Sequence, residues 1–349
     1  MDHDVIVIGG GVAGLTCAAA LAPHADVCVI EAEDVLGHHA SGRSAALFEE
    51  NYGNAAVRAL TRAGRAFLED GGYLGPRGTM LVAGPGDADR FAAEAADKGM
   101  ERIGPEAALA HWPVLDLDAS PFAAVNMATP GIDTDRLLQD SARTIHSNGG
   151  SIVTGARAEA IEPGWRIAGR TAPILVNAAG AWADGIAALA GIPPIGLLPH
   201  RRSVAVVDAP DQDISAAPMV FGLGESWYAK PEAGRLLISP ADETPVEPHD
   251  AWAEDETLAE GIARYEAHMS HRVTRLRSSW AGLRTFAPDR SLVIGWGGPG
   301  FLWLAGQGGY GFQTAPGAAG LARDLVLGRR PELDPALVDA LSPSRFAHA

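Results

Sequence analysis

The chain has 349 residues, of which 47% are hydrophobic and 20% charged, and its formal net charge is −16. A chain of this length can form about two domains. The acidic balance excludes a nucleic-acid-binding surface, which needs clustered Lys and Arg, and no stretch has the run of about 20 apolar residues of a membrane span. Cys17 and Cys28 lack the spacing of a metal site or disulfide framework, so we expect a reducing, cytoplasmic location.

The amino-terminal segment predicts a dinucleotide-binding unit. A β-branched run over residues 4–8 is followed by the pattern G-x-G-x-x-G at Gly9, Gly11 and Gly14, and then by a small-residue helical segment. In that order the glycines let the backbone turn sharply toward a pyrophosphate, and the helix N-terminus supplies N–H donors. A second strand ends at Glu31, where a carboxylate can accept from ribose hydroxyls. The alternative, a glycine-rich turn without a nucleotide, does not explain this full order.

The segment that follows Glu31 favours FAD over NAD. It is a long polar insertion with several glycines, at a place where an NAD-binding domain usually continues directly into its next helix. Arg43 and Ser44 in this loop can reach the phosphates of a cofactor that the loop wraps. Alternatively, Arg43 forms only a surface ion pair. We therefore expect FAD, held permanently.

Other chemistries find little support in the sequence. His38 and His39 could tether a flavin covalently, but two adjacent histidines in a polar loop are more often solvated or close to a phosphate. The patterns G-x-S-x-G and H-E-x-x-H do not occur, nor does a clustered carboxylate site. We expect non-covalent FAD and no metal.

The order of strand-like and helical segments predicts an α/β fold with a discontinuous, Rossmann-like FAD-binding domain. An inserted α+β substrate domain is expected to be built on an antiparallel sheet, because residues 197–239 read as strand after strand separated by turns. The FAD-binding domain is assigned to residues 1–72, 134–196 and 279–349, and the substrate domain to 73–133 and 197–278.

A second glycine-rich segment lies near the carboxyl end, with four glycines within residues 306–311. Glycine loses the most conformational freedom on folding and buries no side chain, so such a run indicates that the backbone must lie very close to something. We expect that neighbour to be a flat flavin ring with a small substrate. A helix beginning near Gln313, with Pro316 in its first turn, would direct its positive end at the ring.

Taken together, these motifs resemble the D-amino acid oxidase superfamily of FAD enzymes, and within it the branch of bacterial D-arginine dehydrogenase. The segments that carry the resemblance include "VIVIGGGVAGLT", "GHHASGRSAALFEENYGN", "LVNAAGAWAD", "WAGLRTFAPD" and "AGQGGYGFQT". The resemblance implies cofactor contacts from the residues at matching positions. These are Gly9, Gly11, Val12, Ala13, Gly14, Glu31, Ala32, Gly42, Arg43, Ser44, Ala45, Ala46, Ala179, Gly180, Trp182, Gly308, Gly309, Tyr310, Gly311 and Gln313.

The resemblance also implies a set of residues around the substrate, namely Arg284, Tyr52, Tyr228, Arg201 and the backbone carbonyl of Gly309. Arg284 lies in an apolar segment, and its planar fork suits the two oxygens of a carboxylate. A buried pair with an internal acid is the alternative. Arg201 and Arg202 are adjacent on an expected strand, so only one of them can face the site, and the family match selects Arg201.

Two positions depart from the pattern of the arginine enzymes. Leu47 replaces a histidine and Thr79 replaces a glutamate that meets the guanidinium, which favours a neutral or apolar substrate side chain. The resemblance then implies oxidation of a D-amino acid at its α carbon, giving an imino acid that hydrolyses to a 2-oxo acid and ammonia. The electron acceptor is left open. Alternatives are an oxygen-using oxidase of glycine, sarcosine or another secondary amine, a flavoprotein hydroxylase that needs NAD(P)H, and a dinucleotide-binding module without catalysis.

Overall fold

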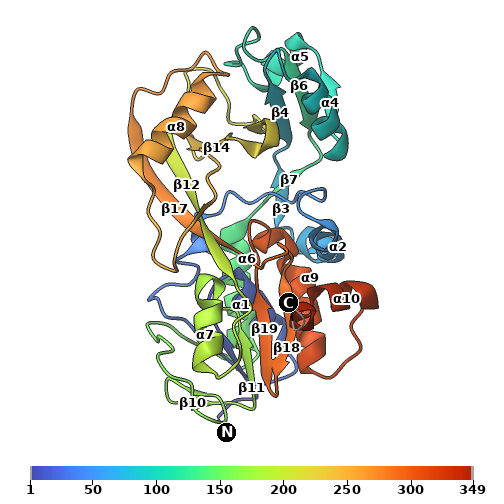
Figure 1. Ribbon diagram of the computed structural model, residues 1–349, viewed down its shortest axis with the longest axis vertical. Helices are drawn as coiled ribbons and strands as arrows, with labels where there is room; N and C mark the ends of the chain where they lie inside the picture. Colours follow the sequence, from blue (N-terminus) through green and yellow to red (C-terminus); the bar gives the residue numbers. More distant parts are fainter. Residues whose placement is uncertain (1, 347–349) are drawn as a thin grey trace.

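The computed structural model describes residues 2–346 and has two lobes stacked along its long axis (Figure 1). The lower lobe contains the first strand and the last helices of the chain, and the upper lobe is built from its middle. Two long strands, β12 (Leu198–Asp208) and β17 (Leu276–Phe286), extend from one lobe toward the other. None of the described helices combines the length and apolar character needed to cross a bilayer.

The lower lobe is centred on a six-stranded sheet in the order β18-β19-β11-β1-β2-β8. Its strands pair in parallel except for β18, which runs antiparallel to β19. A parallel sheet of this kind, covered by helices on both faces, confirms the Rossmann-like expectation. The strands are β1 (Val5–Ile8), β2 (Val27–Ile30), β8 (Ser151–Val153), β11 (Ile174–Asn177), β18 (Val293–Gly298) and β19 (Phe301–Ala305).

Successive residues of β1 face opposite sides of this sheet, as the two-residue period of a strand requires. Val5 and Val7 pack with the helices α1 and α9, whereas Ile6 and Ile8 pack on the side of α7. Both faces are therefore buried. The helices of this lobe are α1 (Val12–Leu21), α2 (Ala55–Ala63), α3 (Arg65–Asp70), α6 (Thr134–Ser147), α7 (Ala183–Leu189), α9 (Gly311–Val326) and α10 (Pro335–Leu341).

The upper lobe contains a nine-stranded sheet in the order β16-β12-β15-β14-β13-β4-β6-β5, with β17 also paired to β12. The expectation of an antiparallel sheet needs one correction, because β4 and β13 pair in parallel. These two strands are far apart in sequence, so no local turn fixes their relative direction. The strands not yet placed are β4 (Thr79–Ala83), β5 (Glu101–Ile103), β6 (Phe122–Asn126), β13 (Met219–Gly222), β14 (Tyr228–Glu232), β15 (Arg235–Ser239) and β16 (Thr244–Pro245).

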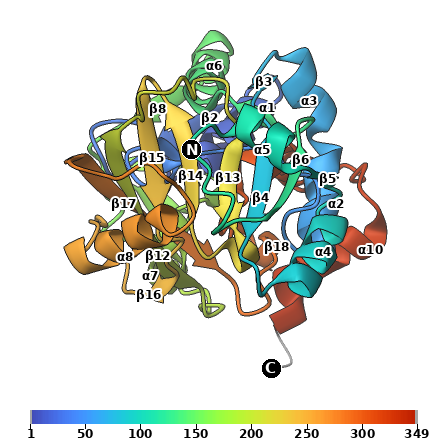
Figure 2. The ribbon, with the colours of Figure 1, turned by 90° about the horizontal axis from the view of Figure 1, so that it is seen from above.

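The two faces of the upper sheet have different neighbours. Met80 and Val82 of β4 pack in the cluster that contains residues of α8 (Asp255–Glu266) and α5 (Pro105–His111). Leu81 and Ala83 face the other way, toward α4 (Ala88–Asp97). Figure 2 shows these helices around the strands as seen from above. Thr79 shares the second face, and this face borders the cavity described below.

The predicted domain boundary at 278/279 falls inside β17. This strand pairs with β12 from Leu276 to Phe286, so the upper sheet extends to Phe286. The sequence gives no signal at the true boundary, because the single strand β17 runs through the predicted one. Nearer the amino end, the lobes are joined by the two-stranded ribbon of β3 (Leu74–Pro76) and β7 (Pro130–Ile132). The described chain is completed by the hairpin of β9 (Arg166–Ile167) and β10 (Arg170–Thr171) and the 3-10 turns η1 (Ala40–Arg43), η2 (Gly180–Trp182), η3 (Leu223–Glu225) and η4 (Pro343–Phe346).

Candidate active site

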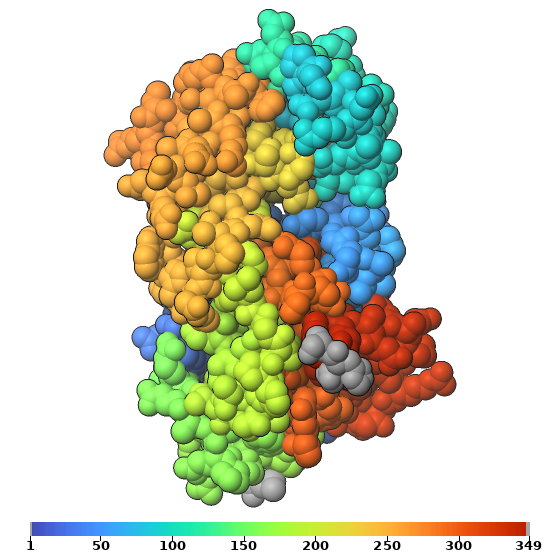
Figure 3. Space-filling model, in the orientation of Figure 1, coloured from blue at the N-terminus to red at the C-terminus, as the bar shows by residue number. Residues whose placement is uncertain are grey.

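A cavity of about 640 Å³ extends from the carboxyl edge of the lower sheet to the underside of the upper sheet. Its wall is formed by segments far apart in the sequence: the β1–α1 turn, the loop after β2, β17, and the glycine run before α9. The space-filling view shows residues from the beginning, middle and end of the chain meeting at the waist between the lobes (Figure 3). In open α/β sheets, ligands bind at the carboxyl ends of the strands.

The β1–α1 turn forms one end of the cavity, with Gly9, Gly11, Val12 and Ala13 in its wall. Gly9 has φ +111°, and a Cβ there would lie 2.4 Å from the carbonyl oxygen of Ala178, so only glycine fits. Any Cβ on Gly14 would lie 1.9 Å from the carbonyl oxygen of Gly9. Gly14 was predicted to contact the cofactor, but it lies outside the cavity wall and instead lets α1 pack closely on the turn.

Glu31 lies at the end of β2 and lines the cavity, as predicted. Its Oε2 accepts from the backbone N–H of Gly10 at 2.5 Å, and its Oε1 accepts from that of Glu33 at 2.9 Å. These two bonds fix the carboxylate beside the glycine turn. A carboxylate oxygen can accept more than one hydrogen bond, so Glu31 retains acceptor capacity for a ribose hydroxyl.

The loop after β2 supplies Ala32, Ser44, Ala45 and Ala46 to the cavity wall, as predicted. Gly42 is not in the wall, because its N–H bonds the carbonyl of Gly37 at 2.6 Å inside the loop. From the sequence, Ser41 belongs to the loop expected to wrap the cofactor and bond its phosphates, but the structure gives its side chain a partner within the protein. Its Oγ accepts from the N–H of Val12 at 2.9 Å and so fixes the loop to the start of α1.

Arg43 does not have the expected freedom to bind phosphates. Its guanidinium pairs with Asp250 and donates to the carbonyl oxygens of Ala251 at 2.8 Å and Ala281 at 2.7 Å. The ion-pair alternative therefore describes Arg43 better, although the residue lines the cavity. Arg43 thus joins the loop after β2 to the upper lobe. We call this loop, with its contact to Asp250, the strap; several of its residues line the cavity.

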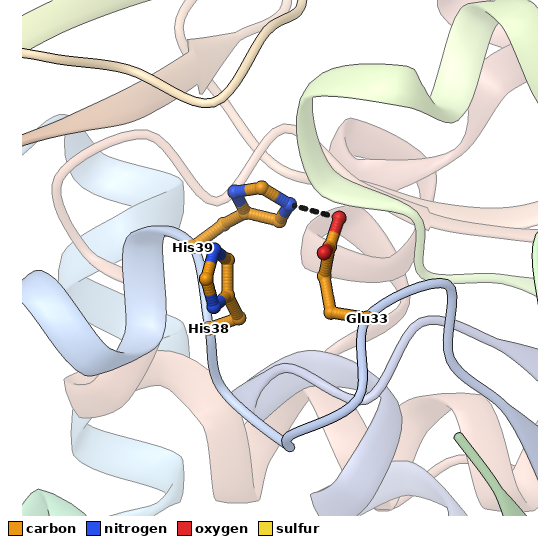
Figure 4. Close-up of side chains that lie close together, drawn as sticks. All are labelled: Glu33, His38 and His39. Carbon is orange, nitrogen blue, oxygen red and sulfur yellow. Dashed lines mark hydrogen bonds and ion pairs between the residues drawn. The ribbon is translucent and has the colours of Figure 1, made fainter. Parts of the chain in front are cut away.

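Next to this strap, the ligand-type atoms of Glu33, His38 and His39 all lie within 4.8 Å of one another (Figure 4). His39 Nε2 is 3.0 Å from Glu33 Oε1, and His38 Nε2 is 3.3 Å from Asp250 Oδ2. Arg157 lies 3.5 Å from Glu33. The geometry of the cluster is compatible with a metal ion, but its one carboxylate, Glu33, already has His39 and Arg157 as partners, so we assign it to the strap.

The glycine run before α9 forms the other end of the cavity. Gly308 has φ +50°, and a Cβ there would lie 2.2 Å from the ring of Phe286. A Cβ on Gly309 would lie 2.9 Å from Nη1 of Arg284. The run therefore makes room for side chains of β17 as well as for a ligand. The cavity wall also includes the predicted residues Ala179, Gly180, Trp182, Gly308, Gly309, Tyr310, Gly311 and Gln313.

Helix α9 begins at Gly311, two residues earlier than predicted, with Tyr310 at its N-cap. Pro316 is consequently the sixth helical residue and does not lie in the first turn. The first helical residues line the cavity, so the positive end of the helix faces it. The side chain of Gln313 bonds protein groups: it accepts from the N–H of Glu49 at 3.3 Å and donates to Thr61 at 2.9 Å.

Arg284 projects from β17 into the cavity wall. Its Nη1 donates to the hydroxyl of Tyr52 at 3.4 Å, and it has no ion-pair partner among the described residues. Burial lowers the pKa of Arg284, but Tyr52, Tyr228 and Glu225 raise it, and the net shift is upward, so the guanidinium stays charged. The expected alternative, a pair with an internal acid, is not what the structure shows.

Arg202, and not the predicted Arg201, lines the cavity. The guanidinium of Arg201 pairs with Glu254 and, at 3.5 Å, with Asp242, which hold it outside the wall. Adjacent residues of a strand face opposite sides, so placing Arg201 elsewhere puts Arg202 in the site. Burial, followed by the charge of Arg284, lowers the pKa of Arg202. Arg202 has one acidic partner, Glu243 at 3.4 Å, whereas Arg284 has none among the described residues, so the unpaired positive charge of Arg284 marks a site for an anion.

The remaining predicted residues also lie in this wall. Tyr52, Tyr228, Leu47 and Thr79 all line the cavity. Sequence reasoning missed three charged residues of the same wall, Glu49, Lys98 and Glu225, because no motif or spacing connects them and they meet only in the folded chain.

A family model described as "FAD dependent oxidoreductase" (DAO) matches residues 4–325. The chain belongs to this family. Its fold is similar to that of glycine oxidase from Geobacillus kaustophilus, with a TM-score of 0.83, 22% identity and 98% of each chain covered. L-proline dehydrogenase from P. horikoshii gives a TM-score of 0.83 at 22% identity and covers 99% of this chain and 98% of its own.

Two further comparisons extend this picture. L-α-glycerophosphate oxidase from Mycoplasma pneumoniae, solved with FAD bound, has a TM-score of 0.81 at 17% identity over 95% of this chain and 96% of its own. Among curated relatives, D-amino acid dehydrogenase from Chromohalobacter salexigens is 42% identical over 69 residues. The match covers 20% of this chain and only 16% of that relative. The cofactor of this DAO-family chain is therefore FAD, whereas its substrate is not given by similarity.

The cavity of the DAO-family chain fits that cofactor. Gly9 and Gly11 keep side chains away from the β1–α1 turn, and Glu31 stands at the end of β2. Within the glycine run, Gly308, Gly309 and Gly311 line the cavity with main chain alone. These features suit, in turn, a pyrophosphate, a ribose and a planar ring. The fit agrees with the order in which the sequence motifs predict the parts of FAD.

Proposed function

We propose that this chain is an FAD-dependent dehydrogenase of D-amino acids, bound to FAD non-covalently and acting in the cytoplasm. The observation that carries the proposal is the pair Arg284 and Arg202 beside the main chain of Gly309, since Arg284 has no carboxylate partner among the described residues. A partly buried guanidinium left unpaired is costly, although less so than the about 3–5 kcal/mol of a fully buried one, so a ligand carboxylate is the expected partner.

The residues of the wall can perform the positioning that the reaction needs. Arg284 and Arg202 bind the substrate carboxylate, and the hydroxyl of Tyr52, already 3.4 Å from Arg284, can share in that contact. The carbonyl of Gly309 accepts from the substrate amine, which must lose its proton before the α carbon is oxidised. Tyr228, buried in the same wall, closes the site from the upper sheet. Bound FAD supplies the hydride acceptor at N5.

The product of such an oxidation is an imino acid, which water hydrolyses to the 2-oxo acid and ammonia. An oxidase that passes electrons to oxygen would use the same wall, and the two differ in how fast the reduced flavin reacts with air. Glycine oxidase and L-proline dehydrogenase share the fold, so glycine, N-methyl and L-amino acids belong in the test panel with D-amino acids.

Replacement of Arg284 tests the proposal. We expect Arg284→Ala to bind FAD normally and to raise KM for amino acids about 100-fold or more, because a charge-assisted, two-bond contact is lost. Arg284→Lys should recover only part of this loss, since an ammonium lacks the planar fork. The measurement is steady-state kinetics together with the flavin content of each variant. An unchanged KM in Arg284→Ala would remove the carboxylate anchor and with it the proposal.

A further inference from the structure

Glu49 lines the cavity but has no part in the mechanism above. Its carboxylate accepts only from the N–H of Asn51 at 3.3 Å and from Oγ1 of Thr129 at 3.5 Å, both long contacts. Among the described residues it has no ion-pair partner, because the nearby Lys98 binds Glu225 at 2.9 Å. A half-buried carboxylate without a cation is costly unless a ligand completes its contacts.

Hydrogen bonds place this carboxylate close to Thr79. The N–H of Phe48 bonds the carbonyl of Pro130 at 2.9 Å, so the loop that carries Glu49 lies along the start of β7. In the same strip, the carbonyl of Thr129 accepts from the N–H of Gly78 at 2.7 Å. Thr79 follows directly, and its Oγ1 is buried without a hydrogen-bond partner while the residue lines the cavity. The Glu49 carboxylate and the unpartnered Thr79 hydroxyl thus come from segments that are hydrogen-bonded to the same strip, and both residues line the cavity; we call this part of the wall the charged corner.

The charged residues of the wall gather around Tyr52. Its hydroxyl receives the bond from Arg284, and Arg202 lies in the same wall. Lys98 lies over the Tyr52 ring, 5.8 Å from its centre, and pairs with Glu225. Because Glu225 already balances Lys98, Glu49 adds a negative charge that no ion pair among the described residues balances. A molecule with a carboxylate at one end and a hydrogen-bond donor at the other is complementary to such a cavity.

Resting on the amino acid oxidation proposed above, we infer that Glu49 is a specificity-determining residue that binds the end of the substrate side chain. The preferred substrates then carry a nitrogen donor there, an ammonium, guanidinium or amide group, and Oγ1 of Thr79 accepts a second N–H. Leu47 and Thr79 alone favour a neutral or apolar side chain. The charged corner, which sequence reasoning did not reveal, shifts that preference to a donor-bearing one.

The test compares two amino acids that differ only at the end of the side chain, lysine and norleucine, in the enantiomer that the protein oxidises. We expect wild-type kcat/KM to be higher for lysine by about tenfold or more, as for a charge-assisted hydrogen bond. Glu49→Gln, which keeps the shape of the side chain, should abolish most of this preference through KM. Glu50→Gln is the matched control, because Glu50 pairs with Arg65 and lies outside the cavity wall.

A preference for norleucine in the wild type, or a lysine preference that survives Glu49→Gln, would overturn the inference. The binding of ligands that cannot be oxidised tests the role of Glu49 separately from the proposed function. 6-Aminohexanoate and hexanoate lack an α-amine and cannot be oxidised there, so their affinity is read from the flavin spectrum. If Glu49 binds a donor, 6-aminohexanoate binds more tightly than hexanoate in the wild type and in Glu50→Gln but not in Glu49→Gln, even where no amino acid is oxidised. Equal binding of the two acids would contradict it.

Discussion

A side chain at position 309 would collide with the guanidinium of Arg284. The Cβ that alanine adds lies 2.9 Å from Nη1 and 3.1 Å from Cζ, too close for either atom to remain in place. The site therefore requires glycine at position 309, because the lack of a side chain there leaves room for the guanidinium of Arg284. The same residue offers its carbonyl to the substrate in our proposal, so main chain and guanidinium position the substrate together.

Gly309→Ala should therefore displace Arg284 and raise KM for amino acids about tenfold or more, since a misplaced group loses most of its orienting effect. FAD binding should change little. The control is Gly185→Ala, at a cavity-lining glycine whose Cβ would meet nothing within 4 Å. Steady-state kinetics of both variants check this, and equal KM values would contradict the contact between residues 309 and 284.

The pH dependence of substrate choice belongs to Glu49. Burial raises the pKa of Glu49, and the N–H of Asn51 and the charge of Lys98 only partly oppose the shift. Protonation removes the negative charge that attracts a side-chain cation. As pH falls through this raised pKa, KM for lysine should increase relative to norleucine, at a pH above the ordinary value of about 4.3. Lysine and norleucine carry the same α-amine, so its titration cancels in the ratio of their KM values. A KM ratio that stays constant down to about pH 4.3 would argue against the role of Glu49.

At the scale of elements, α9 follows the glycine run and packs on α2. A Cβ on Gly317 would lie 2.5 Å from the carbonyl oxygen of Leu60, whereas Gly320, one turn later, meets nothing within 4 Å. The helices approach closely at Gly317, and Gly64, the C-cap of α2, faces the same point, because a Cβ there would lie 3.1 Å from the backbone N of Gly317. This approach fixes the start of α9 against the loop that carries Glu49 and Tyr52.

Alanine at these two positions should have opposite effects. Gly317→Ala should lower the free energy of unfolding by about 1–3 kcal/mol through overpacking. Gly320→Ala should raise it by up to about 1 kcal/mol, because alanine is the better helix former. Thermal or denaturant unfolding of the FAD-bound protein measures both. A stabilised Gly317→Ala variant would mean that the helices are packed less closely than the structure shows.

Elements with local signals could be predicted from sequence, and those that depend on tertiary pairing could not. The glycine turn, α1 and the acid at Glu31 follow one another within the chain, so their order was enough. The choice between Arg201 and Arg202 depends on which face of β12 meets the cavity, and a two-residue period does not define that face. Glu49 and Lys98 come from separate segments, and only the fold brings them to one wall.

At the scale of the whole molecule, residues of both lobes line one cavity, and the paired strands β12 and β17 of the upper sheet extend toward the lower lobe. The lower sheet presents the features that suit a dinucleotide. The upper sheet contributes Arg202, Tyr228 and Thr79, so it determines which molecule is presented to the ring. The ion pair between Arg43 and Asp250 holds the strap to the upper lobe beside the cavity.

Anaerobic mixing of the FAD-loaded protein with a panel of D-, L- and N-methyl amino acids tests the central claim most directly. The readout is the absorbance of the oxidised flavin. We predict that D-amino acids, above all those with a donor at the end of the side chain, bleach the flavin, and that matching amines without a carboxylate do not. A protein that binds FAD but is bleached by no amino acid, or equally by amines that lack the carboxylate, would contradict the account.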